Sequence, residues 1–187
     1  MSSPVLWYAT RATGLVAMLL LTATILLGIF TTARFHRPNW PRFAQQSLHR
    51  NVSLLTLAFV TVHVLTSVLD TYVHIGWSAI FVPFASHYRP FWVGLGSIAL
   101  DLFLAVLISS VVRHWISARI WRGLHWLAYA SWPVAIAHGI GTGTDAWRSW
   151  STSLTLACVL AVIVSLVWRV SRPLTTVTAG GPSRIDR

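Results

Sequence analysis

The stretch LHRNVSLLTLAFVTVHVLTSVL, residues 48–69, decides what kind of fold this chain adopts. It contains no charged residue from Asn51 to Leu69, and it carries His49 near its start and His63 fourteen positions later. About 20 apolar residues suffice for a helix to cross the roughly 30 Å hydrocarbon core of a bilayer. The stretch therefore predicts a membrane-spanning helix with a histidine near each face.

Four other apolar runs of similar length flank this one. The five runs are Ala12–Ala33, Asn51–Leu69, Phe91–Val112 (interrupted by Asp101), Gly123–Thr144 and Ser149–Trp168. Across the 187 residues, 55% are hydrophobic and only 10% are charged, whereas a soluble domain has about 25% charged residues. The sequence predicts an all-α integral membrane protein, a five-helix transmembrane bundle that crosses the lipid bilayer several times.

Arginine placement predicts the orientation of this bundle. All 14 basic residues are arginine, and the formal net charge is +10. Eleven of them fall on one side of the predicted spans and three on the other, and positive residues favour the cytoplasmic side. We expect the N-terminus outside and the C-terminus in the cytoplasm. Since the charges lie between apolar runs instead of along one polar face, they argue against nucleic-acid binding.

The chain divides into a bundle over residues 1–172 and a tail over residues 173–187. The tail combines Pro, Gly, Ser, Thr and Arg, a composition typical of disorder, so we expect a disordered cytoplasmic tail. Between the second and third spans, Thr71–Pro90 has an apolar centre with Pro83, which favours an interfacial or re-entrant segment. The single Cys158 excludes a disulfide within the chain.

Histidine spacing in two of the runs is the feature that points to chemistry. His49 and His63 are fourteen residues apart, and His125 and His138 are thirteen apart. At 1.5 Å per residue, these separations are about 21 Å and about 19.5 Å along a helix. The second and fourth spans run in the same direction, so we expect His49 to face His125 on the cytoplasmic side and His63 to face His138 on the outer side.

Two pairs of imidazoles at matching depths suit two iron centres. Imidazole is a strong axial ligand for haem iron, and facing helices of a bundle place such ligands without any loop. We therefore predict that all four histidines bind metal as haem ligands. Thirteen residues turn a helix about 140° short of four turns, so the fourth span needs a distortion between its histidines, and Pro133 could supply it.

Other roles for these histidines stay open. A histidine within a membrane helix can pack against a carbonyl or move protons, so a non-redox transporter or channel that uses the histidines for protons or metal is the alternative. A quinol-oxidising cytochrome b of another lineage would also fit such spacing. The remaining histidines lie in connecting segments, where a solvated role is expected: His36, His74, His87 and His114.

The fourteen-then-thirteen spacing, with the sequences around it, resembles the ferric reductase-like transmembrane family. That family includes yeast ferric reductases, the membrane part of NADPH oxidases and the haem subunit of bacterial methionine-sulfoxide reductase systems. The surrounding segments are Leu48–Asn51, Val62–Val64, Leu124–Leu127 and Ala137–Gly139, and the likeness to short bacterial members covers about residues 5–170. It implies two b-type haems in a bacterial plasma membrane.

The resemblance also implies partners. This sequence lacks the FAD/NADPH domain of the oxidases, so we expect an electron-transfer subunit of an oxidoreductase instead of an independent reductase. Electrons would come from a separate cytoplasmic flavoprotein or from quinol. They would pass to an outer acceptor such as a ferric chelate, a flavin protein or oxygen.

Four further residues are assigned roles near the predicted haems. Arg50 and Arg122 adjoin the cytoplasmic histidines and are predicted to bind haem propionates, although both also fit ordinary inside-positive charges. Trp132 lies midway between the fourth-span histidines and either bridges the haems or packs in the core. Asp101, near mid-membrane, is expected to pair with Arg11 or to belong to a proton route.

Overall fold

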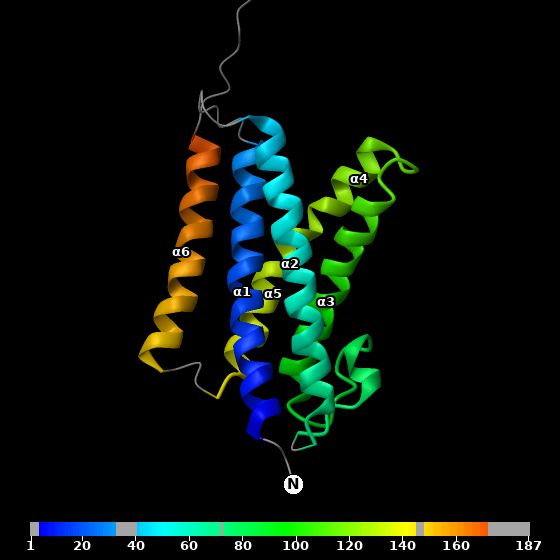
Figure 1. Ribbon diagram of the computed structural model, residues 1–187, viewed down its shortest axis with the longest axis vertical. Helices are drawn as coiled ribbons and strands as arrows, with labels where there is room; N and C mark the ends of the chain where they lie inside the picture. Colours follow the sequence, from blue (N-terminus) through cyan, green and yellow to red (C-terminus); the bar gives the residue numbers. More distant parts are fainter. Residues whose placement is uncertain (1–3, 33–40, 72, 145–147, 172–187) are drawn as a thin grey trace, which may run out of the picture.

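The computed structural model describes residues 4–32, 41–71, 73–144 and 148–171, and this part of the chain is helical without any strand. The helices are α1 (Pro4–Thr32), α2 (Arg42–Leu69), the short 3-10 helix η1 (Trp77–Ile80), α3 (Pro90–Val111), α4 (Ala118–His125), α5 (Leu127–Thr142) and α6 (Ser149–Ser171). Figure 1 shows the long helices side by side and roughly parallel to one axis. The predicted tail, residues 173–187, lies outside the described residues.

Four of these helices are long and apolar enough to cross a membrane. They are α1, α2, α3 and α6, with the search confined to the residues that the structure describes. The prediction of an all-α chain with several possible membrane spans is therefore confirmed at this level.

The fourth predicted span, Gly123–Thr144, is not one continuous helix. It is divided at Trp126 into α4 and α5, and α5 has only 16 residues. The N–H of Trp126 bonds to the carbonyls of both Arg122 and Gly123 at 3.2 Å, and the N–H of Tyr129 bonds to the Trp126 carbonyl at 3.0 Å. The bonds from Trp126 to Gly123 and from Tyr129 to Trp126 span three residues and tighten the turn, as in a 3-10 helix.

The position of this interruption differs from the predicted one. Helix α5 runs through Pro133 without a break in its assignment, whereas Trp126 immediately follows His125. An interruption of the kind that the thirteen-residue spacing required is therefore present at Trp126, where the hydrogen-bonding pattern changes.

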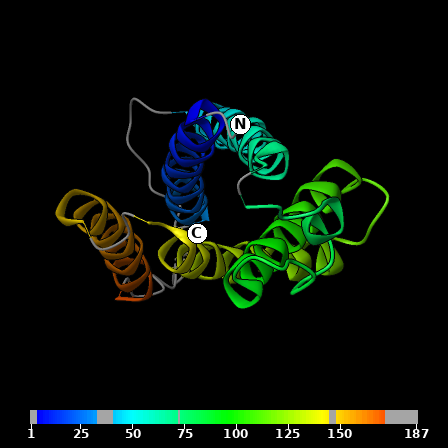
Figure 2. The same cartoon turned by 90° about the horizontal axis from the view of Figure 1, so that it is seen from below.

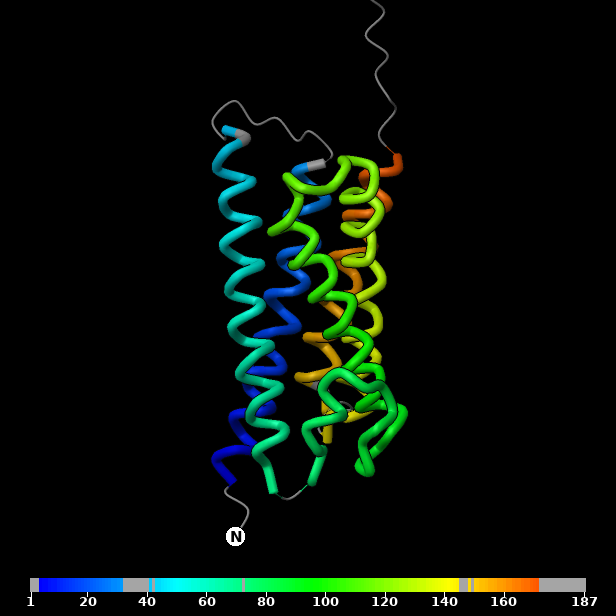
Figure 3. Tube along the Cα trace, turned by 90° about the vertical axis from the view of Figure 1, so that its right-hand side faces the viewer, coloured from blue at the N-terminus to red at the C-terminus, as the bar shows by residue number. Residues whose placement is uncertain are grey.

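The helices pack as two pairs joined along one edge. Helix α1 packs along α2, α3 packs along α5, and α1 also contacts α5 and α6. Figure 2 shows the two pairs end-on, with α6 on the far side of α5 from α3. The tube in Figure 3 shows that α1, α2 and α3 extend over similar heights.

A small buried cluster joins α1, α5 and α6. Its members are Leu21, Ile25, Ile29, Trp132, Ile136, Cys158 and Val162. Inside it, the Trp132 indole Nε1 donates a hydrogen bond to Thr22 Oγ1 at 3.0 Å. Because a buried indole N–H needs an acceptor, this bond fixes α5 against α1.

The segment between α2 and α3 is compact but apolar on its exposed side. It contains η1, whose Ala79 is buried and accepts a hydrogen bond from Ser97 Oγ of α3 at 2.5 Å. Trp77, Phe81 and Phe84 are exposed. This arrangement is compatible with the predicted interfacial segment, since exposed aromatic side chains are favoured at the membrane–water boundary.

Candidate functional site

The four histidines predicted as ligands meet in two pairs. The imidazole centroids of His63 and His138 are 6.3 Å apart, with their ring planes at 81°. The centroids of His49 and His125 are also 6.3 Å apart, with their planes at 59°. We call His63 and His138 the lower pair and His49 and His125 the upper pair, because α2 runs from its start at the top of Figure 1 to its end at the bottom. Both predicted pairings are present in the structure.

The lower pair is held by hydrogen bonds to the backbone of two other helices. His63 Nδ1 lies 2.8 Å from the Thr10 carbonyl oxygen of α1, and His138 Nδ1 lies 2.8 Å from the Trp92 carbonyl oxygen of α3. A carbonyl can only accept, so in each ring Nδ1 carries the hydrogen and donates. The other nitrogen, Nε2, then has a free lone pair and is ready to bind a metal ion.

Glycines make these contacts possible. In an α-helix the carbonyl of residue i is bonded to the N–H of residue i+4, and the residues four positions after Thr10 and Trp92 are Gly14 and Gly96. A Cβ built on Gly14 would lie 2.9 Å from Cε1 of His63, and one built on Gly96 would lie 2.6 Å from Cε1 of His138. Both distances are too short for a side chain, so only glycine lets the imidazoles approach.

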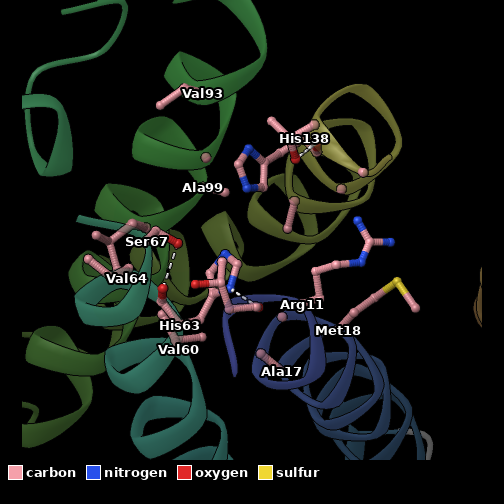
Figure 4. Close-up of a pocket in the computed structure, with 18 of the residues that line it drawn as sticks. Arg11, Ala17, Met18, Val60, His63, Val64, Ser67, Val93, Ala99 and His138 are labelled. Atoms are coloured by element: carbon pink, nitrogen blue, oxygen red, sulfur yellow. Dashed lines mark hydrogen bonds between the residues drawn. The ribbon is translucent and has the colours of Figure 1, made fainter. Parts of the chain in front are cut away.

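A cavity of about 320 Å³ surrounds the lower pair. Its lining comes from α1, α2, α3, α5, the segment that contains η1 and the first turns of α6, and is mostly apolar. His63 and His138 enter it with Arg11 and Asp70. Figure 4 shows the two imidazoles directed toward one another from α2 and α5, with Arg11 beside them. An apolar cavity with a few convergent polar groups is the usual form of a cofactor site.

The upper pair has a different surrounding. Nδ1 of His49 and Nδ1 of His125 are both buried without a hydrogen-bond partner among the described residues. The Thr24 backbone of α1 lies close to the His49 imidazole, but Nδ1 of His49 makes no hydrogen bond to it. A Cβ built on Gly28, four residues after Thr24, would lie 3.6 Å from Cε1 of His49, an ordinary contact distance. The upper imidazole of α2 therefore sits farther from the backbone of α1.

Aromatic and cationic side chains cover His125. The Trp121 ring centroid is 5.0 Å from that of His125, with the planes at 31°. The guanidinium carbon of Arg113 lies 5.3 Å from the Trp121 ring centroid, within range of a cation–π interaction. Neither Trp121 nor Arg113 was predicted to belong to the site, although Trp121 lies one helical turn before His125.

The two arginines predicted to bind haem propionates are both exposed in the structure. Arg50 is exposed, and Arg122 is exposed with its Nε donating to the Ala118 carbonyl of its own helix at 3.1 Å. Their predicted role as propionate partners stays a prediction. The expected pair between Arg11 and Asp101 is wrong: no ion pair of Asp101 occurs among the described residues, and Arg11 Nη1 donates to Thr144 Oγ1 at 2.6 Å.

Sequence reasoning missed the glycines and the carbonyls beside them. The signal was available, because Gly14 and Gly28 are fourteen residues apart, like His63 and His49 on the antiparallel helix that they contact. A glycine in an apolar run looks like a neutral spacer until its neighbour is known.

Comparisons of this chain with protein-family models, with curated proteins and with solved structures gave no match. No group of three or more His, Cys, Asp or Glu side chains placed to hold a metal ion occurs in the part of the chain that the structure describes. Each site discussed above consists of two imidazoles.

Proposed function

We propose that this chain is a di-haem b-type membrane cytochrome that transfers electrons across the membrane. In this proposal His49 with His125 would hold one haem, and His63 with His138 would hold the other. The donor is a cytoplasmic flavoprotein or quinol, and the acceptor lies on the outer side. When bound, the two haems supply one-electron carriers at two depths in the membrane.

The distance between the paired rings is the observation that carries the proposal. Bonds between a metal ion and an imidazole nitrogen are about 2.0–2.1 Å long, and the ring centroid lies about 1.1 Å beyond the nitrogen. Two imidazoles on opposite sides of one metal ion therefore have centroids about 6.3 Å apart. Both pairs have a separation of 6.3 Å.

The hydrogen-bonding state of the lower pair adds support. A histidine that binds a metal ion commonly donates its other N–H to a backbone carbonyl, which fixes the tautomer and the ring orientation. His63 and His138 both make this bond through Nδ1, to Thr10 and Trp92. Two half-buried imidazoles that only filled space would not need the same tautomer.

The packing of the helices supports a flat group between them. The α1–α2 pair and the α3–α5 pair contact each other chiefly through α1 and α5, and the cavity around the lower pair is lined from both. A porphyrin has the apolar bulk to fill such a space, and its four nitrogens complete the coordination begun by two imidazoles.

The optical spectrum of the purified full-length chain after dithionite reduction tests the proposal. We expect a low-spin b-type α band and two haems per chain. Alanine at any of the four paired histidines should remove one of the two haems, because a pair with one imidazole lacks an axial ligand.

Exposed histidines provide matched controls. His74 and His114 lie outside both pairs and are exposed, so alanine at either position should leave both haems bound. Absence of the α band from the unaltered protein would reject the proposal and favour the transporter or channel alternative. Retention of both haems in all four paired variants would reject the ligand assignment.

A further inference from the structure

We infer that the two histidine pairs give haem centres of unequal reduction potential, and that the lower pair's centre is the harder one to reduce. This inference rests on the proposed function and deepens it. It follows from a difference in how the chain holds the far nitrogen, Nδ1, of each imidazole.

The two pairs differ in the hydrogen bonds made by Nδ1. Both Nδ1 atoms of the lower pair donate to backbone carbonyls at 2.8 Å. Both Nδ1 atoms of the upper pair are buried without such a partner among the described residues. The ring separations are nevertheless equal at 6.3 Å, so ligand type and spacing do not distinguish the two centres.

The electronic consequence has a definite sign. When an imidazole donates its Nδ1–H to a carbonyl, electron density moves into the ring, and Nε2 becomes a more basic ligand. A more basic ligand stabilises Fe(III) relative to Fe(II), so it lowers the reduction potential. Two such bonds act on the lower centre, and neither upper imidazole has one.

The sequence of α3 does not repeat the spacing of glycine and carbonyl that α1 has. In α1 the two carbonyls beside the imidazoles, those of Thr10 and Thr24, are fourteen residues apart. In α3 the carbonyl fourteen residues after Trp92 is that of Val106, and Ser110 occupies the place that glycine has in the other three cases. Ser110 Oγ and Ser109 Oγ both donate to the Val106 carbonyl, at 2.7 Å and 2.9 Å. That carbonyl is already engaged by hydroxyl groups of its own helix.

Gly14 and Gly96 are therefore positioning residues for the lower centre. Each leaves the space through which an imidazole reaches its carbonyl, and a methyl group there would push the ring away. Gly123 is exposed, and an added Cβ there has nothing within 4 Å, so it offers a glycine control outside the cavity.

The test is a redox titration of the purified full-length protein, followed at the α band. Each centre takes up one electron, Fe(III) to Fe(II), supplied by dithionite through mediators. His49→Ala leaves only the lower centre and His138→Ala leaves only the upper one, which assigns the potentials. At a potential where the upper centre is half reduced, we expect a reduced-to-oxidised ratio about threefold or more lower at the lower centre.

The glycine variants test the cause. Gly96→Ala should raise the reduction potential of the lower centre toward that of the upper one, whereas Gly123→Ala should leave the lower potential unchanged. Gly14→Ala displaces the other imidazole of the pair, that of His63. It replaces Gly96→Ala in the test if the Gly96→Ala protein no longer binds the lower haem. Gly28→Ala should leave the upper potential unchanged, because its added methyl group meets His49 at an ordinary distance.

The outcomes separate the inference from the proposed function. If the unaltered protein shows no haem absorption at all, both the proposed function and this inference are overturned. Two bound haems with equal potentials, or a lower centre that is the easier one to reduce, would overturn the inference alone. If both Gly14→Ala and Gly96→Ala lose the lower haem, the two single-centre histidine variants still decide the order of the potentials.

Discussion

Helix α2 and the α4–α5 segment each carry two of the paired imidazoles, but they position them in different ways. In α2, fourteen residues of unbroken helix separate His49 from His63, so both imidazoles lie on nearly one face. In the other segment thirteen residues separate His125 from His138, and the helix is interrupted at Trp126. With thirteen residues instead of fourteen, an unbroken helix would turn one of the two imidazoles by about 100° away from its partner. The tight turn at Trp126 compensates for this rotation.

The largest expected effect comes from breaking the register of α2. Insertion of one alanine after Ala58 turns the two ends of the helix about 100° relative to each other. His49 and His63 then cannot both face their partners, and we expect loss of at least one of the two haems. The measurement is the haem-to-protein ratio of the purified variant.

A matched insertion distinguishes register from general damage. One alanine inserted after Trp115, in the exposed turn between α3 and α4, changes no distance along α2. It should keep both haems. If the insertion in α2 also kept both, the fourteen-residue spacing would not be what positions these ligands.

A smaller effect is expected at the proline of α5. Because the interruption lies at Trp126, Pro133→Ala should preserve both haems. It should also raise the stability of the bundle, by up to about 3 kcal/mol, because alanine restores a helical N–H that proline lacks. Thermal unfolding in detergent, followed together with the α band, measures both. Loss of the lower haem in this variant would mean that Pro133 does set the relation between His125 and His138.

The smallest effect concerns the bond that joins the two helix pairs. Trp132→Phe removes the indole N–H that donates to Thr22 Oγ1 at 3.0 Å, and Thr22→Val removes the acceptor. Each single change should lower the free energy of unfolding by about 1–3 kcal/mol, because a buried polar partner is left unsatisfied. The double variant should lose less than the sum of the single losses. Additive losses in the thermal melts would show that the two side chains do not act together.

Much of the architecture could be predicted from composition and apolar run length. Four of the five predicted apolar runs correspond to the long apolar helices α1, α2, α3 and α6. This agreement is expected, because a run of about 20 apolar residues has few other stable forms in a bilayer. The partition of Gly123–Thr144 could not be foreseen in the same way. Hydropathy reports side-chain polarity and contains no information on the change of backbone hydrogen bonds at Trp126. Pro133 was predicted as the site of distortion because proline is the residue known to break helical hydrogen bonds.

The site was predictable in its ligands but not in its supports. Histidine spacing located both pairs, since helical rise converts sequence separation directly into height. The anchors of the lower pair are backbone carbonyls, which every residue carries, so no side-chain type at Thr10 or Trp92 announces them. The pairing of Arg11 with Asp101 failed because opposite charge at similar depth does not specify which helices are neighbours.

The position of α6 bears on how the protein is made. All four paired histidines and the glycines beside them precede residue 144, whereas α6 begins at Ser149 and packs on α1 and the core cluster. During synthesis, the groups that would receive the prosthetic molecules have all left the ribosome before the last helix does. Binding of the proposed haems can thus begin on the nascent chain, and α6 then completes the buried cluster with Cys158 and Val162.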